Sequence, residues 1–390
     1  MTIRGLIAVM LQRWQFLFRK LQLCVDLISG KFIFKVRSAK STPRGRALLI
    51  YIAYPFWKKT AVVHSNIREV PIIADLLAER GYDVDVIDFR SEALVSFERY
   101  SVIFGFGDLF EEAVSAGIDA RCIFYATQAP QWIHNLAEAK RIVDFQFRTG
   151  TRLKPRRMLD RTWPASAVLS DAIVCVTDGW AYERYRELHQ RVYSVPITAF
   201  GPSEIERTSY SGGDERVDFV WFGSTGALHK GLDLCIEAVS QMSDVVLNVC
   251  GSVLAEKDFM SAIQRYLTGS NVKFLGRIDP LSSGMRNLMR STGFVVLPSA
   301  SEGCATGVLT CMAWGCVPVI TEYCGISFPE AVRIRELTVE SVTQAIRTAK
   351  NLPAQECRRR SEKARAWAAE RHTSDEFAKG LKRVLADIGI

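Results

Sequence analysis

Short apolar runs alternate with amphipathic helical patterns over most of the chain. In the first half, helical patterns at 69–80, 133–144 and 179–190 separate most of these runs. Each run has the length and continuous apolarity expected of a buried strand in a parallel sheet. The alternation therefore predicts a doubly wound α/β domain. Its strands are expected at 47–52, 84–88, 101–104, 121–125, 172–176 and 192–195.

A second series of the same kind follows a segment at 202–214 whose serines and glycines are typical of a linker. The fold class predicted is α/β, with two doubly wound Rossmann-like domains that face a cleft. We expect a helical tail at 1–45, the two domains at 46–205 and 206–375, and a terminal helix at 376–390. In the second domain strands are expected at 217–222, 245–250, 272–275, 294–297 and 317–320, and helices at 231–241, 258–267, 284–290, 306–314, 340–351, 355–371 and 375–386.

The composition is that of a globular protein, with 48% hydrophobic and 24% charged residues, and it excludes disorder and collagen. The net charge of +8 lies in residues 1–45, which hold nine lysines and arginines against one acid, so the other residues sum to zero. Nucleic-acid binding by the body is therefore not indicated. Basic residues beside Trp14, Phe16 and Phe18 predict an amphipathic helix on an anionic membrane surface. A helix packed against the body is the alternative.

The ten cysteines form no Cys-x-x-Cys pair and the five histidines form no His-x-x-x-His pair, so neither a metal site nor a cofactor is expected. Free thiols and the lack of a clean signal peptide predict a cytoplasmic protein. The apolar stretch at 294–321 contains Glu302 and two prolines, and it divides into strand, loop, helix and strand instead of a membrane span.

Two loops of the second domain carry candidate chemistry. The loop at 223–230 (GSTGALHK) begins with Gly223, Ser224 and Thr225 and brings Lys230 to the start of a helix. A helix N-terminus presents free N–H groups and about half a positive charge, so this loop suits an anion. A simple turn with a solvated lysine is the alternative.

The second loop follows the strand at 294–297 and reads PSASEGCATGV. Glu302 can accept hydrogen bonds from hydroxyls, and the amides of Thr306, Gly307 and Val308 can face an anion. Both loops follow strands of one sheet, so together they suit a polyhydroxy ligand that bears phosphate. A surface glutamate between turn glycines is the alternative.

These residues resemble the donor domain of the family 4 glycosyltransferases, which are retaining enzymes of glycosyl transferases group 1 with the two-domain GT-B fold. SEGCATGVLTCMAWGCVPVIT is similar to the signature loop and helix of that family, and VWFGSTGALHKGLDLCIEAV to its phosphate loop. The resemblance implies a nucleotide-sugar donor, with Lys230 on the diphosphate and Glu302 on the sugar. It makes 46–205 the acceptor-side domain and 206–375 the donor domain.

Two positions depart from the family pattern. Ser224 stands where an arginine usually follows the glycine, and Thr310 stands where a second glutamate usually contacts the ribose. Compared with the family pattern, the site therefore has fewer cations for the diphosphate. Thr310 can offer the ribose only a neutral hydrogen bond, which is weaker than one to a carboxylate. The family also places a histidine near the reacting sugar. His134 is the candidate for this role, with a locally bonded helix-start histidine as the alternative, and His64 is the second candidate.

The sequence thus predicts a glycosyltransferase that moves a sugar from a nucleoside diphosphate to a glycan or lipid-linked acceptor in cell-surface polysaccharide biosynthesis. It would be peripheral on the inner face of the membrane. One alternative is a nucleotide-sugar epimerase of the same fold, which would need several acid/base groups around the sugar. The other is a non-catalytic partner subunit. Ser224 and Thr310 are the reason for this alternative, because they stand in place of the usual arginine and glutamate.

Overall fold

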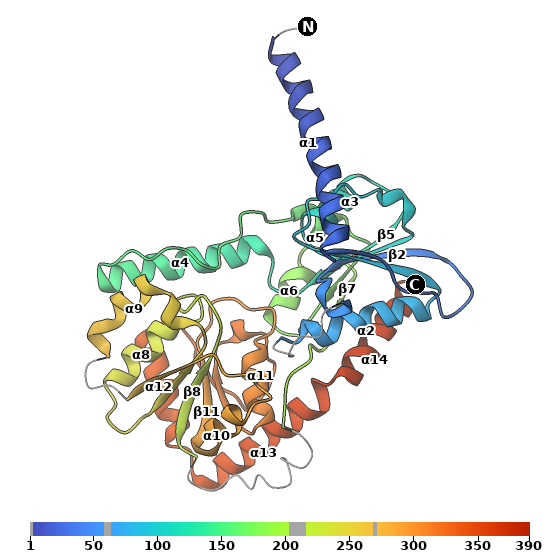
Figure 1. Ribbon diagram of the computed structural model, residues 1–390. Helices are drawn as coiled ribbons and strands as arrows, with labels where there is room; N and C mark the ends of the chain where they lie inside the picture. The colour runs from blue at the N-terminus through green and yellow to red at the C-terminus, as the bar shows by residue number, and fades with distance from the viewer. Residues whose placement is uncertain (1–2, 58–63, 203–215, 268–270) are drawn as a thin grey trace.

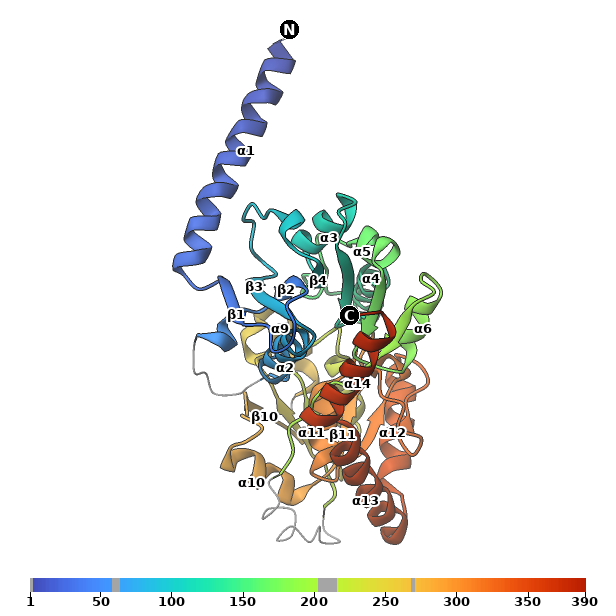
Figure 2. The same cartoon turned by 90° about the vertical axis from the view of Figure 1, so that its right-hand side faces the viewer.

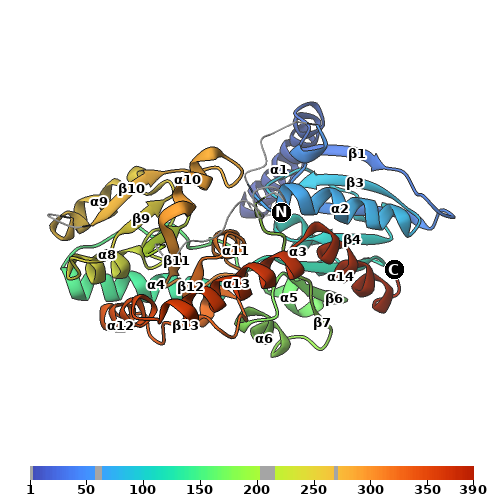
Figure 3. The same ribbon diagram turned by 90° about the horizontal axis from the view of Figure 1, so that it is seen from below.

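The computed structural model describes residues 3–57, 64–202, 216–267 and 271–390. Two α/β domains lie side by side, each built around its own sheet (Figure 3). This arrangement confirms the predicted fold class. Nearly all of the linker predicted at 202–214 lies outside the described residues.

The N-terminal sheet has seven strands in the order β1-β3-β2-β4-β5-β6-β7. Its six parallel strands confirm the six that the sequence predicts. The first strand was missed, because it lies inside the expected tail, and it pairs antiparallel with β3 at the sheet edge. The domain therefore begins before the boundary expected at 45. The strands are β1 (Phe32–Arg37), β2 (Gly45–Tyr51), β3 (Tyr82–Asp88), β4 (Val102–Gly105), β5 (Arg121–Ala126), β6 (Ala172–Cys175) and β7 (Val192–Ser194).

Helices α2 (Asn66–Glu79), α3 (Asp108–Ser115), α5 (Pro164–Leu169) and α6 (Trp180–Arg186) accompany this sheet. Helices α3 and α5 are short and were not predicted from the sequence. Helix α4 (Gln131–Thr149) follows β5 but extends away from the sheet and lies beside α8 and α9 of the other domain (Figure 1). There Arg141 of α4 forms a buried ion pair with Asp233 of α8. A helix of the N-terminal half is thus a structural part of the C-terminal half.

The C-terminal sheet is parallel throughout, with strand order β10-β9-β8-β11-β12-β13. It confirms the five predicted strands and adds the two-residue strand β13. The strands are β8 (Asp218–Phe222), β9 (Leu247–Cys250), β10 (Val272–Gly276), β11 (Thr292–Leu297), β12 (Val317–Ile320) and β13 (Val332–Arg333). The helices are α8 (Leu232–Ser240), α9 (Lys257–Ile263), α10 (Ser283–Ser291), α11 (Thr306–Ala313) and α12 (Val339–Lys350).

The apolar stretch at 294–321 forms β11, α11 and β12, as expected. Within the described residues, no helix has the length and apolarity needed to cross a membrane. All ten cysteines are free thiols, and most of them are buried.

The last two helices return the chain to the N-terminal domain. Helix α13 (Ala354–Arg371) covers α11, and α14 (Ser374–Asp387) packs on α2 (Figure 2). The Thr373 side chain accepts a hydrogen bond from Glu376 N and so caps the start of α14. Arg80 Nη2 donates to the carbonyl of Lys382 at 3.0 Å. The predicted terminal helix is therefore an integral part of the N-terminal domain.

The N-terminal part of helix α1 (Ile3–Ile28) projects away from both domains (Figures 1 and 2). Its base is fixed: Arg19 Nη2 donates to Glu112 Oε2 at 2.8 Å, and the buried Asp26 carboxylate accepts from Gln22 at 2.7 Å and from Ser91. The expected tail is thus a helix that is anchored at one end.

Candidate active site

The two predicted loops meet at the carboxyl ends of β8 and β11, which are neighbours in the sheet. Lys230 Nζ forms an ion pair with Glu302 Oε1, and Ser299 Oγ donates to the same oxygen at 2.9 Å. The Lys230 and Glu302 side chains are only 10% and 11% exposed. The geometry therefore brings together the lysine and the carboxylate that the sequence analysis assigns to the diphosphate and the sugar.

Two glycines allow this close approach. Gly231 has φ +68°, and a Cβ there would overlap the carbonyl oxygen of Pro298, the first residue of the loop after β11. At Gly307 a Cβ would lie 2.5 Å from Phe222 O, so the first turn of α11 rests directly on the end of β8. The N-terminus of α11 consequently adjoins the loop at 223–230, where its free amides favour an anion.

Glu302 is ionised at neutral pH. Burial works to raise the pKa of this carboxyl, but the positive charges of Lys230, Arg157 and His229 outweigh burial and lower the pKa to about 2. A carboxylate that stays ionised can accept hydrogen bonds from neutral hydroxyls, and such charge-assisted bonds are stronger than neutral ones. Glu302 is thus suited to bind a polyhydroxy group and unsuited to deliver a proton.

The other residues predicted to bind the donor differ in their exposure. Ser224 and Thr225 are exposed on the loop, whereas Gly223, Thr306 and Gly307 are partly buried. Val308 and Thr310 lie inside α11, with 0% and 2% of their surfaces exposed.

His134 reaches the site from α4, and both of its ring nitrogens have partners. Nε2 lies 2.8 Å from the carbonyl oxygen of Arg157, so it carries the proton, and Nδ1 accepts from Ser301 Oγ at 3.2 Å. Burial, assisted by the positive charges of His229 and Arg157, lowers the pKa of His134 to about 4. His134 is therefore neutral, and it forms a hydrogen bond with Ser301, the residue that precedes Glu302. Its expected place near the reacting sugar stays a prediction.

His64 lies just before α2, in the N-terminal domain. Desolvation by the surrounding protein and the charge of Lys230 lower its pKa, which places the ring within electrostatic reach of that lysine. Gly303 approaches the N-terminal domain so closely that a Cβ would overlap the carbonyl oxygen of Thr127. Both domains therefore contribute to the site. Within the described parts of the chain, no three His, Cys, Asp or Glu side chains gather as metal ligands.

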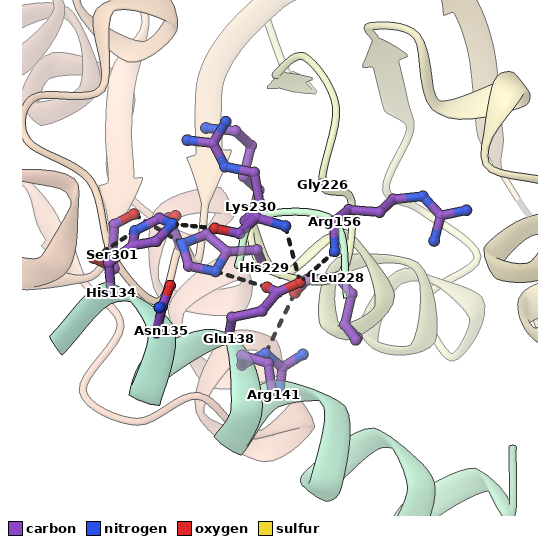
Figure 4. Close-up of polar contacts among 12 residues, drawn as sticks. His134, Asn135, Glu138, Arg141, Arg156, Gly226, Leu228, His229, Lys230 and Ser301 are labelled. Atoms are coloured by element: carbon purple, nitrogen blue, oxygen red, sulfur yellow. Dashed lines mark hydrogen bonds and ion pairs between the residues drawn. The ribbon is translucent and has the colours of Figure 1, made fainter. Parts of the chain in front are cut away.

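Three residues that fix the shape of the two loops were not predicted from the sequence. Glu138 on α4 and His229 in the first loop are bonded to each other at 2.9 Å, and the ring of His229 lies 4.6 Å from that of His134 (Figure 4). Glu256 accepts from the amide of Gly226 at 2.6 Å. A signal was present for two of these residues, because His229 adjoins Lys230 and Glu138 follows His134 by one helical turn.

Comparison with known proteins agrees with this geometry. Residues 216–352, which hold both loops, match the family model described as glycosyl transferases group 1. Residues 216–352 therefore form a domain of the group 1 glycosyltransferase type. No protein of curated function matches the chain in sequence.

Solved structures share the fold of the chain at low identity. HepE of Anabaena, solved with UDP and glucose, is 12% identical, with a TM-score of 0.56, over 88% of this chain and 100% of its own. Sucrose-phosphate synthase of Thermosynechococcus elongatus is 13% identical, with a TM-score of 0.63, over 89% and 99%. WaaG, a glycosyltransferase involved in lipopolysaccharide biosynthesis, is 15% identical, with a TM-score of 0.51, over 88% and 100%. The fold is thus the two-domain GT-B arrangement.

Proposed function

We propose that the protein is a glycosyltransferase that takes a sugar from a nucleoside diphosphate sugar and transfers it, with retention, to a glycan or lipid-linked acceptor in cell-surface polysaccharide assembly. The observation that carries the proposal is the meeting of Lys230 and Glu302 beside the N-terminus of α11. HepE, solved with UDP and glucose, and WaaG, with its role in lipopolysaccharide biosynthesis, support the donor and the acceptor class by analogy.

The chain's own groups suit a mechanism of positioning and electrostatic stabilisation. When the bond from the sugar to the phosphate breaks, the leaving diphosphate keeps the bonding electrons, and Lys230 and the α11 amides face that charge. Glu302 accepts hydrogen bonds from the sugar hydroxyls and thereby orients the sugar. This route needs no nucleophilic side chain. When the donor binds, Lys230 gives up part of its contact with Glu302 and contacts the phosphate instead.

Calorimetric titration with nucleoside diphosphates, followed by turnover assays with a panel of nucleotide sugars, tests the proposal. Lys230→Ala should weaken binding of the matching diphosphate by about 1.5–3 kcal/mol, the range for a hydrogen bond to a charged group, and affect the mononucleoside much less. Glu302→Gln should lower turnover far more than diphosphate binding. Conversion of one nucleotide sugar into another without release of diphosphate would indicate an epimerase instead.

We extend the proposal to the membrane, where a lipid-linked acceptor would lie. The projecting part of α1 exposes a long set of apolar side chains, and the net charge of the protein resides in the segment at 1–45. An exposed apolar helix with cations suits the interface of an anionic bilayer. These side chains, each at least half exposed, are Ile7, Met10, Leu11, Trp14, Phe16, Leu17, Phe18 and Leu21.

Removal of residues 1–18 tests this role without disturbing Arg19 or strand β1. We expect the full chain to sediment with vesicles containing anionic lipid and the truncated chain to stay in the supernatant. The double variant Trp14→Glu, Phe18→Glu keeps the full length of the chain but removes two apolar side chains. It therefore separates loss of apolar contact from loss of length. Equal sedimentation of all three proteins would refute the membrane role.

A further inference from the structure

His229 lies fully buried between two hydrogen-bond acceptors. Its Nδ1 is 2.9 Å from Glu138 Oε2, and its Nε2 is 2.9 Å from the carbonyl oxygen of Ser301. A carbonyl oxygen has no proton to give, so Nε2 must carry one. The state of Nδ1 then depends on which of the two groups, Glu138 or His229, holds the proton between them.

Glu138 is the acceptor in this contact. Its other oxygen, Oε1, accepts from the backbone amides of Arg156 at 2.8 Å and Arg157 at 3.2 Å. Although burial works to raise the pKa of Glu138, the bond to His229 and these amides lower it to about 2. An ionised Glu138 accepts at both oxygens, so Nδ1 of His229 must also donate. His229 therefore carries two ring protons and a positive charge.

The neighbouring histidine has the opposite state. His134 needs a proton only at Nε2, because its Nδ1 faces the hydroxyl of Ser301, which can donate. A charged His229 with its ring centre 4.6 Å away opposes a second charge on His134. Each histidine thus holds Ser301 by a different group: His229 by its carbonyl and His134 by its hydroxyl.

We propose that His229 works as a buried imidazolium that, held between Glu138 and the carbonyl of Ser301, positions Lys230 and Glu302 for the donor. The peptide bonds give the reason: His229 precedes Lys230, and Ser301 precedes Glu302. The bond from His229 to Ser301 therefore fixes the backbones of both donor loops, while the side chains of Lys230 and Glu302 remain able to exchange partners. This inference rests on the proposed function, since it assigns a positioning residue to the same site.

The charged groups around His229 either favour or oppose the imidazolium form of its ring. Glu138 is the carboxylate bonded to the ring. Lys230 adds a positive charge that opposes the imidazolium, and the ionised Glu302 favours it. The groups that surround the ring are His134, Glu138 and Arg141 on α4, Lys154, Arg156 and Arg157 after it, Lys230, Glu256 before α9, and Glu302.

The variant Glu138→Gln removes the charge with little change of shape. The backbone amides of Arg156 and Arg157 fix the oxygen of the new side-chain amide on their side, so its NH2 group must face His229. Nδ1 would then accept instead of donate, and His229 would become neutral with its proton on Nε2. Glu183→Gln, at an exposed position of α6, is the matched control.

Nitrogen-15 NMR of the histidine rings in the full-length protein at neutral pH tests the charge directly. We expect two protonated ring nitrogens for His229 in the unaltered protein and one in Glu138→Gln. Replacing each of the other four histidines by Gln identifies the His229 signals by elimination, even if His229→Gln does not fold. One protonated nitrogen in the unaltered protein would overturn the inference, whether or not any donor is turned over.

The positioning role is tested by the pH dependence of kcat/KM for the donor. We expect an alkaline limb in the unaltered protein and in Glu183→Gln, where His229 loses its second proton. Glu138→Gln should be at least tenfold less active at neutral pH and show no such limb. An imidazolium in the spectrum together with unaltered kinetics of Glu138→Gln would overturn the positioning role. Absence of turnover by the unaltered protein with every donor would count against the proposed function instead.

Discussion

Replacement of Arg141 by methionine should destabilise the protein by about 3 kcal/mol. Arg141 and Asp233 are each 1% exposed, and Arg141 Nη2 donates to both carboxylate oxygens of Asp233, at 2.7 and 2.8 Å. Removal of one partner from a buried ion pair costs about 3–5 kcal/mol, because the other charge stays buried without compensation. Arg148 also pairs with Asp233 and is 25% exposed, which places the expected loss at the lower end of that range.

Urea denaturation of the full-length variants measures this loss. Arg152→Met, at an exposed position just after α4, is the matched control and should change the free energy of unfolding by less than about 0.5 kcal/mol. The double variant Arg141→Met, Asp233→Leu should recover most of the loss, since it leaves no unpaired charge between α4 and α8. A loss below about 1 kcal/mol in Arg141→Met, or no recovery in the double variant, would refute the reasoning.

Three further predictions concern the contact between the domains, the buried histidines and α11. Gly303→Ala should keep the fold but lower kcat/KM for the donor at least tenfold, because the added Cβ would overlap Thr127 O of the other domain. Kinetics and circular dichroism check this, and unaltered kinetics would exclude a tight contact. Burial lowers the pKa values of His134 and His372 to about 4, so between pH 6.5 and 4 the unfolded chain binds protons that the native chain does not, and stability should fall as the pH drops through that window. Denaturation midpoints measured across this window should show a smaller slope for His372→Gln, and an equal slope would contradict the prediction. Thr310→Glu should lower the melting temperature, because the position is 2% exposed, and added nucleoside diphosphate should recover part of the loss if the new carboxylate reaches the ribose.

The sequence predicted those parts of the fold that have a local hydrophobic pattern. The eleven expected strands were recognisable because each is a short apolar run between helices, the pattern of a buried parallel strand. Strand β1 was missed since its basic residues resemble the tail before it, although Phe32 is buried against β3. Its pairing depends on a strand far along the chain, which no local pattern reveals.

The candidate site was predictable only as far as its loops could be placed at strand ends. Lys230 and Glu302 come together as expected, because β8 and β11 are neighbours in a parallel sheet. The spacing of Glu138, one helical turn after His134, puts the two residues on one face of a helix, but it does not reveal the contact with His229, because that contact depends on α4 crossing to the other domain. Such a crossing is a property of packing and leaves no trace in the periodicity of the helix itself.

The return of α14 to α2 has a consequence for how the protein is made. A domain at the start of a chain usually folds on the ribosome before later domains emerge. Here the face of α2 that packs on α14 stays uncovered, and Arg121 Nη1 lacks the carbonyl of Ile388 that it meets at 2.9 Å, until the whole C-terminal domain has been synthesised. We therefore expect the first half to remain a client for chaperones during translation and to be completed only after the second half has folded.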